Sequence, residues 1–116
     1  MPLNAQQKYF AAWLPQHHLP QPKVELTFHK TKRWRFDFAW PAQKIALEIE
    51  GGVFGGTDPK TGRQYKGAHS SIEGILRDIA KYNAAQIAGW KVLRVLPSEL
   101  FTQSTIDLLK KALPHE

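Results

Sequence analysis

Residues 33–50 read RWRFDFAWPAQKIALEIE and contain two runs of alternating side chains. Aromatic side chains alternate with polar or small ones up to Trp40, and large apolar residues alternate again from Ile45 onward. A period of two is typical of β-strands. The four residues between the two runs, 41–44, have a common length for a hairpin loop. The stretch therefore predicts an antiparallel hairpin.

A four-residue loop also predicts the register of this hairpin. It pairs Trp40 with Ile45, and three steps farther it places Asp37 opposite Glu48. One face is then apolar, with the pairs Trp40–Ile45, Phe38–Leu47 and Phe36–Ile49. The other face carries two alanines, then Asp37 opposite Glu48, then Arg35 opposite Glu50. A slip by one residue would mix the two faces, so the pattern itself favours this register.

Two carboxylates in directly opposed strand positions require compensation. Their Cβ atoms lie about 4.5–5.5 Å apart, and like charges at that distance are destabilising. A proton, an arginine or a divalent cation provides the compensation, and Mg²⁺ prefers such oxygen ligands. The residues alone leave two interpretations open. Asp37 and Glu48 either form a metal site for phosphodiester hydrolysis or lie on a solvated face, paired with Arg33, Arg35 or Lys44.

The segments around the hairpin predict the remaining elements. We expect helices over 4–14, 71–88 and 98–112, and further strands over 23–28 and 90–96. In the second helix, Ile72, Ile75, Leu76 and Ile79 make an apolar stripe. A strand–helix–strand step normally makes a parallel crossover. The order α-β-β-β-α-β-α therefore predicts an α/β fold with a central mixed four-stranded sheet flanked by helices. Trp34, Trp40 and Trp90 fit the apolar period of their strands and are predicted core residues.

Length and composition bound the class of protein. A chain of 116 residues without cysteine predicts one domain over 1–116 and excludes disulfides and thiolate metal sites. It contains neither an apolar run long enough to span a bilayer nor a signal-peptide pattern, so we expect a cytoplasmic protein without a membrane partner. The net charge of +6 favours a polyanionic partner, nucleic acid above all.

Residues 51–69 form a polar run with six glycines, which predicts a mobile loop with a functional role. Its cations are Lys60, Arg63, Lys66 and His69. We expect them to make an electropositive flap that contacts nucleic-acid backbone without reading bases. His69 is either a donor to phosphate or an ordinary loop histidine.

The residues described so far resemble a known family. Asp37 on one strand, Glu48-Ile49-Glu50 on the next, and then a helix and a further strand resemble the PD-(D/E)XK nuclease superfamily. The fuller string is similar to small phage- and prophage-type endonucleases over roughly residues 23–96. It comprises 33–41, 48–52, Gly67-Ala68-His69, Gly74, Asp78, Lys81-Tyr82-Asn83 and Gly89-Trp90.

The resemblance implies a restriction-endonuclease-like fold, DNA as the partner and Mg²⁺ or Mn²⁺ as the cofactor. Asp37 and Glu48 match the metal-binding acids, and the backbone carbonyl of Ile49 is a further ligand. Glu25 matches the additional acid that some members place upstream. Its alternative interpretation is an exposed strand glutamate. Arg33 and Arg35 join the loop cations as expected nucleic-acid contacts.

The sequence departs from the family motif at its last position, where Glu50 replaces the usual lysine. Some nucleases use glutamate there, so Glu50 is a catalytic candidate. Its alternative is a salt bridge to Arg35. Lys81 is a candidate source of the missing cation, and its alternative is a solvated pair with Asp78, which shares its helix face.

Three functions of different kind follow. The leading one is a Mg/Mn-dependent deoxyribonuclease of a bacterial or phage-infected cell, with a structure-specific substrate such as a junction, flap or nick. The alternative is a catalytically inactive nucleic-acid-binding module with the same fold, and the third is a basic interaction protein. A domain this small does not easily reach both strands of a duplex, so a homodimer is one expected assembly. Phage recombination, repair and restriction are all open as pathways.

Overall fold

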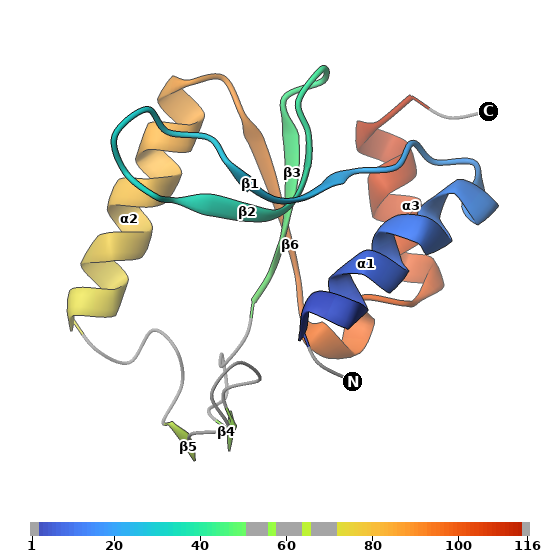
Figure 1. The fold of residues 1–116 in the computed structure, drawn as a ribbon, viewed down its shortest axis with the longest axis horizontal. Helices are drawn as coiled ribbons and strands as arrows, with labels where there is room; N and C mark the ends of the chain where they lie inside the picture. Colours follow the sequence, from blue (N-terminus) through green and yellow to red (C-terminus); the bar gives the residue numbers. More distant parts are fainter. Residues whose placement is uncertain (1–2, 51–55, 58–63, 66–71, 115–116) are drawn as a thin grey trace.

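The computed structural model describes residues 3–50, 56–57, 64–65 and 72–114. In this part of the chain the fold is α/β, with three α-helices and a four-stranded sheet (Figure 1). The long elements are α1 (Leu3–Trp13), β1 (Lys23–Thr27), β2 (Arg35–Trp40), β3 (Ile45–Ile49), α2 (Ile72–Ile87), β6 (Lys91–Val95) and α3 (Gln103–Ala112). The predicted order of helices and strands is therefore confirmed.

Short elements account for the rest. One 3₁₀ turn, η1 (Leu14–His17), follows α1, and another, η2 (Pro97–Glu99), precedes α3. The last helix was predicted from residue 98, but η2 takes up those residues and α3 begins five residues later, after Thr102. The predicted structureless loop also needs correction, because β4 (Gly56–Thr57) and β5 (Gln64–Tyr65) pair within it. The rest of 51–71 lies outside the described residues.

The main sheet is mixed, as predicted, with strand order β1-β2-β3-β6. β1 and β3 run antiparallel to β2, whereas β6 runs parallel to β3. The register of the central hairpin matches the prediction at three pairs, Trp40–Ile45, Ala39–Ala46 and Phe38–Leu47. This register places Glu48 on the same face as the two alanines.

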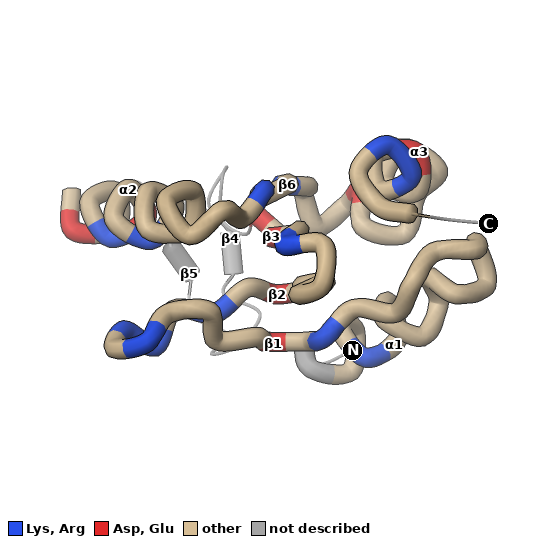
Figure 2. Tube along the Cα trace, turned by 90° about the horizontal axis from the view of Figure 1, so that it is seen from above, with Lys and Arg blue, Asp and Glu red and all other residues tan. Residues whose placement is uncertain are grey.

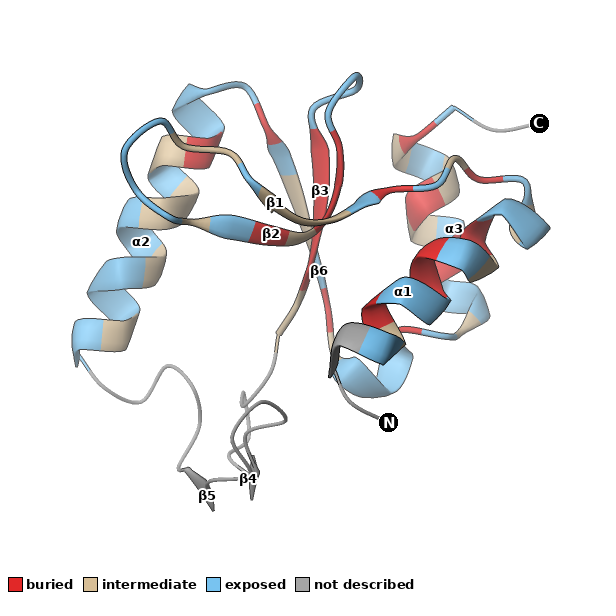
Figure 3. Cartoon of the chain, in the orientation of Figure 1, coloured by how far each residue is buried: buried red, intermediate tan, exposed pale blue. Residues whose placement is uncertain are grey.

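The sheet lies between two helical layers, which Figures 1 and 2 show from two directions. One face packs on α1 and α3 in a core that includes Phe10, Phe38, Trp40, Leu47 and Ile106. The other face packs on α2 in a smaller core, the α2 core, which consists of Phe36, Ala39, Ala46, Ala85 and Trp90. The predicted core positions Trp40 and Trp90 are buried, whereas Trp34 is half-buried and precedes β2. In Figure 3 the buried residues follow the middle of the sheet and the inner side of α1 and α3.

Phe36 is on the opposite face from the one predicted. It belongs to the α2 core and stacks on Phe28, with ring centroids 4.1 Å apart. At Glu25 the side chains of the β1–β2 pair change from one face of the sheet to the other. The φ of Glu25 is 56°, which is rare for a residue with a side chain. Val24 before it packs with the α1 and α3 side, and Leu26 after it packs on the α2 core.

The apolar stripe of α2 also differs from the expectation of a packed face. Ile72, Leu76 and Ile79 are 76%, 59% and 51% exposed, and Ala85 near the end of α2 is its buried residue. Figure 1 shows the first turns of α2 farther from the sheet than its last turns. Because the helix diverges from the sheet, only its second half reaches the carboxylates of β3. No helix among the described residues has the length and apolar character needed to cross a membrane.

Candidate active site

The first feature of the site is the point where β2 and β3 separate. Strand pairing ends at Phe38–Leu47, so the predicted strand pairs beyond it do not form: Asp37 with Glu48, Phe36 with Ile49 and Arg35 with Glu50. Beyond that point the backbone N–H of Ile49 donates to Oδ2 of Asp37 over 2.7 Å. The carboxylate thus replaces a backbone acceptor, and this hydrogen bond fixes Asp37 at the opening between the strands.

Glu48 lies on β3 beside this opening and is only 6% exposed. Its Oε1 accepts a hydrogen bond from the amine of Lys81, at 2.7 Å. Lys81 comes from the second half of α2 and is largely buried too. The structure therefore brings Asp37, Glu48 and Lys81 together, and Lys81 points into the carboxylates.

The electrostatics of the site centre on Glu48. The pKa of Glu48 is raised to about 8. Burial is the largest cause, the charge of Asp37 and a hydrogen bond with it also raise the pKa, and Lys81 lowers it. Burial disfavours the ionised carboxylate because it removes water from the charge. One lysine does not offset two neighbouring acids, so the site favours an additional positive charge, a proton or a cation.

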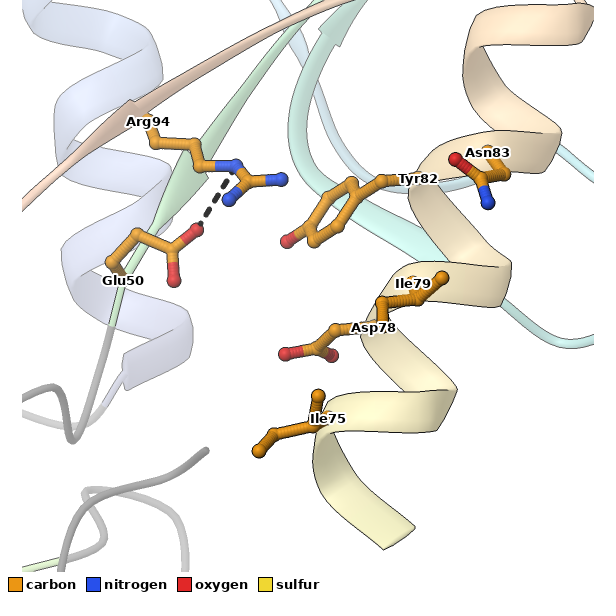
Figure 4. Close-up of a pocket in the computed structure, with 7 residues that line it drawn as sticks. All are labelled: Glu50, Ile75, Asp78, Ile79, Tyr82, Asn83 and Arg94. Carbon is orange, nitrogen blue, oxygen red and sulfur yellow. Dashed lines mark ion pairs between the residues drawn. The ribbon is translucent and has the colours of Figure 1, made fainter. Parts of the chain in front are cut away.

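Glu50 is partnered by a residue that the sequence did not indicate. The predicted partner was Arg35, which instead lies opposite Thr27 in the β1–β2 ladder. Arg94 of β6 takes this role, with Nε 3.3 Å from Oε1 of Glu50 (Figure 4). β3 and β6 pair in parallel with Arg94 beside Glu48, so the arginine borders both acids.

Tyr82 completes this side of the site. The Cζ atom of Arg94 lies 3.9 Å from the centroid of the Tyr82 ring, within the range of a cation–π contact. The pKa of Tyr82 lies above its usual value, first because the ring is buried and then because Glu48 and Glu50 are negatively charged. Tyr82 therefore stays protonated beside the acids and is a hydrogen-bond donor there.

Glu25 is not brought to the carboxylate pair. Its Oε1 accepts a hydrogen bond from Nε2 of Gln7 at 3.0 Å, and Gln7 belongs to α1, on the other side of the sheet from Lys81. Among the described residues, no group of three or more acids, histidines or cysteines is placed to hold a metal ion. The carboxylates of the site are therefore Asp37 and Glu48, with Glu50 bordering them.

The expected nucleic-acid contacts are described in part. Arg33 and Arg35 are both exposed, at and just before the start of β2. Lys60, Arg63, Lys66 and His69 lie outside the described residues, as does most of the predicted mobile loop. The structure thus places two of the six expected contacts.

The donor set suits a hard divalent cation. Asp37 and Glu48 offer carboxylate oxygens, and Ile49, whose N–H donates to Asp37, directly follows Glu48 in the chain. Mg²⁺ is typically held by one or two carboxylates together with water and phosphate oxygens. Comparison of the chain with protein-family models, with curated proteins and with solved structures gives no match. The chemistry of the site must therefore be argued from its own residues.

Proposed function

We propose that this protein is a metal-dependent endonuclease that hydrolyses DNA phosphodiester bonds. The observation that carries the proposal is the buried Glu48 beside Asp37, with the amine of Lys81 2.7 Å away. Burying one acid against another costs stability, and a fold keeps such a pair where it serves a ligand or a reaction.

In this proposal Asp37, Glu48 and the carbonyl of Ile49 hold a Mg²⁺ or Mn²⁺ ion. A divalent ion at such a site supplies positive charge for the pentacovalent phosphorus and acidifies water. The hydrogen bond from Ile49 N–H keeps the carboxylate of Asp37 oriented toward the site without a change of rotamer. This preorganisation lowers the cost of assembling the site when substrate binds.

Lys81 fills the role for which the family motif usually provides a lysine on the strand. Its amine already donates to Glu48, so it lies beside the proposed ion position. There it orients the attacking water or donates to a phosphoryl oxygen, either of which favours the transition state. Glu50 is held by Arg94 and borders the site, where it tunes charge and accepts protons or hydrogen bonds.

Two further observations support DNA as the substrate. The chain carries a net charge of +6, and Arg33 and Arg35 are exposed where β2 begins. Exposed arginines of this kind bind the phosphate backbone irrespective of base sequence. The α/β architecture, with the acids at the point where two central strands separate, agrees with a restriction-endonuclease-like core.

The test is a cleavage assay with a supercoiled plasmid, a single strand and a four-way junction, each with Mg²⁺, Mn²⁺ or EDTA. The proposal expects cleavage that requires metal and that Asp37→Ala and Glu48→Ala both abolish. Cleavage that survives in both variants would place the active site elsewhere. Salt-sensitive DNA binding without cleavage under any metal would leave the inactive nucleic-acid-binding module as the function.

A further inference from the structure

A hollow of about 370 Å³ lies between the end of β3, β6 and α2, beside the carboxylates (Figure 4). Glu50 and Arg94 form its sheet side, and its helix side consists of residues of α2: Ile75, Asp78, Ile79, Tyr82 and Asn83. Its size is that of a small-molecule site, for which about 300 Å³ is the lower bound. We call this hollow the α2 slot.

The α2 slot adjoins the proposed site of cleavage. Glu50 follows Glu48 by two residues, and Tyr82 is the chain neighbour of Lys81. Arg94 pairs with Glu48 in the parallel ladder and with the side chain of Glu50. A nucleotide next to a phosphate at Asp37 and Glu48 therefore reaches the α2 slot with its base.

The charges of the α2 slot favour a base over a phosphate. Its lining carries two carboxylates, Glu50 and Asp78, against the single guanidinium of Arg94, so a phosphate is repelled. Figure 4 shows the carboxylates of Glu50 and Asp78 facing one another from opposite sides of the hollow. An uncharged group with hydrogen-bond donors is the complementary ligand.

The remaining walls fit a flat ring. Ile79 is 51% exposed although it is a large aliphatic side chain, and Ile75 beside it is also exposed. Tyr82 adds an aromatic ring to the same helix side, and across from the isoleucines lies the planar guanidinium of Arg94, 3.9 Å from the centre of that ring. Extrahelical bases are held between aromatic or apolar side chains and planar cations of this kind. A base enters such a site only when it is unpaired.

The carboxylates also select among the bases. Carboxylate oxygens only accept hydrogen bonds, and each group has about four lone-pair positions, so one existing partner does not exhaust them. Adenine, cytosine and guanine carry exocyclic amino groups that donate to such acceptors, whereas thymine has none. The donors of the lining, on Arg94, Tyr82 and Asn83, suit ring nitrogens and carbonyls, and every base carries acceptors of this kind. The two carboxylates therefore make the difference, and the slot binds the amino-bearing bases better than thymine.

We propose that the α2 slot binds an unpaired, amino-bearing base of the nucleotide next to the cleaved phosphate. This inference rests on the proposed nuclease function and specifies its substrate: a single-stranded or extrahelical nucleotide beside the cut. The α2 slot positions that nucleotide, so that its phosphate is held at the carboxylates of β2 and β3.

The test uses thymine pentanucleotides that differ at the central position, which is adenine, cytosine, thymine or an abasic site. Binding is measured by fluorescence anisotropy with Ca²⁺, and cleavage with Mg²⁺ or Mn²⁺. The proposal expects the adenine and cytosine strands to bind, and to be cut beside the central nucleotide, at least about fivefold better than the other two. The abasic strand lacks the stacking of one base, and the thymine strand lacks an amino group that donates to a carboxylate.

Matched variants assign the effect to the α2 slot. Ile79→Ala removes its apolar wall and should weaken binding of the adenine strand about fivefold or more. Ile87→Ala removes an isoleucine of the same helix that is 89% exposed and lies outside the slot, and it should bind like the wild type. Asp78→Asn adds donors to the lining and should reduce the preference for adenine over thymine.

The outcomes separate this inference from the proposed function. If the wild type cuts all four strands equally and Asp78→Asn changes nothing, the inference is overturned and the nuclease function stands. If no strand is cut under any metal, the nuclease function fails, and the binding affinities measured by anisotropy then test whether the α2 slot binds a base. Equal affinity for the adenine, thymine and abasic strands overturns base binding by the α2 slot. A preference for the adenine strand that Ile79→Ala removes supports base binding by the α2 slot.

Discussion

The amine of Lys81 on α2 lies 2.7 Å from Oε1 of Glu48 on β3, which joins two residues 33 positions apart. The contact ties the second half of α2 to the sheet at the point where β2 and β3 separate. It also places a lysine amine beside the acids of β2 and β3.

Lys81→Gln should lower the rate of cleavage by about 100-fold, because the variant lacks a positive charge next to the reacting phosphate. Arg77→Gln is the control, since it removes a cation from the same helix at an exposed position. The measurement is the rate constant at saturating metal and DNA, with circular dichroism to check the fold. Equal rates for wild type and Lys81→Gln would exclude the amine from the reaction.

Asp37→Asn and Asp37→Ala should differ in stability but not in activity. The amide oxygen of asparagine still accepts the N–H of Ile49, whereas alanine leaves this donor without its partner at a cost of about 1–3 kcal/mol. Both variants lose a carboxylate of the proposed metal site. In urea unfolding, Asp37→Asn should therefore have a higher free energy of unfolding than Asp37→Ala, and neither variant should cut DNA. Equal unfolding midpoints would show that the hydrogen bond does not hold the strands.

The metal-free protein should lose stability as the pH rises from about 5 to 8. Native Glu48 keeps its proton up to a pKa of about 8, but it releases this proton near pH 4.5 when the chain unfolds. The native state thus binds more protons in this window, and the free energy of unfolding falls with pH, by on the order of 4 kcal/mol at most.

Glu48→Gln should remove most of that pH dependence and raise the free energy of unfolding at pH 8 in EDTA. Glu73→Gln, at an exposed position in the first turn of α2, should leave the pH dependence as it is. Urea titrations of the three proteins at pH 6, 7 and 8 measure the difference. A wild type whose stability does not fall over this range would contradict the raised pKa.

Glu25→Gln should keep metal binding and most of the activity. The carboxylate of Glu25 is engaged by Gln7 of α1, and it is not clustered with Asp37 and Glu48. Glutamine preserves an oxygen acceptor for Gln7, so stability should change little. Calorimetric titration with Mn²⁺ compares the variant with the wild type. A loss of metal affinity similar to that of Glu48→Gln would make Glu25 a third ligand of the site.

Part of this cluster could be predicted from the sequence because side chains alternate between the faces over the paired part of the hairpin. The alternation from Phe38 to Leu47 predicts the register that the structure has, and this register leads Asp37 and Glu48 to the point where the strands separate, although Phe36 lies on the α2 side. What alternation does not contain is the point where pairing stops. That point depends on the Asp37 side chain, which accepts the N–H of Ile49. The change of face at Phe36 accompanies a positive φ at Glu25, where the sequence has no glycine to indicate it.

The contributions of α2 and β6 were harder to predict. Lys81 and Asp78 share a helix face in the sequence, and only the angle at which α2 meets the sheet decides which of them reaches Glu48. Arg94 becomes a neighbour of Glu50 through the parallel register of β3 and β6, and no tight turn fixes that register. Both contacts are tertiary, so local periodicity carries no signal for them.

The most direct test of the central claim, that Asp37 and Glu48 hold a divalent ion, is calorimetric titration of Mn²⁺ in buffers of different ionisation enthalpy. At pH 7 we expect one or two ions to bind, with release of close to one proton, because Glu48 must ionise to bind metal. At pH 9.5 proton release should vanish, and Asp37→Asn and Glu48→Gln should not bind. No binding by the wild type, or equal binding by both variants, would show that Asp37 and Glu48 do not hold the ion.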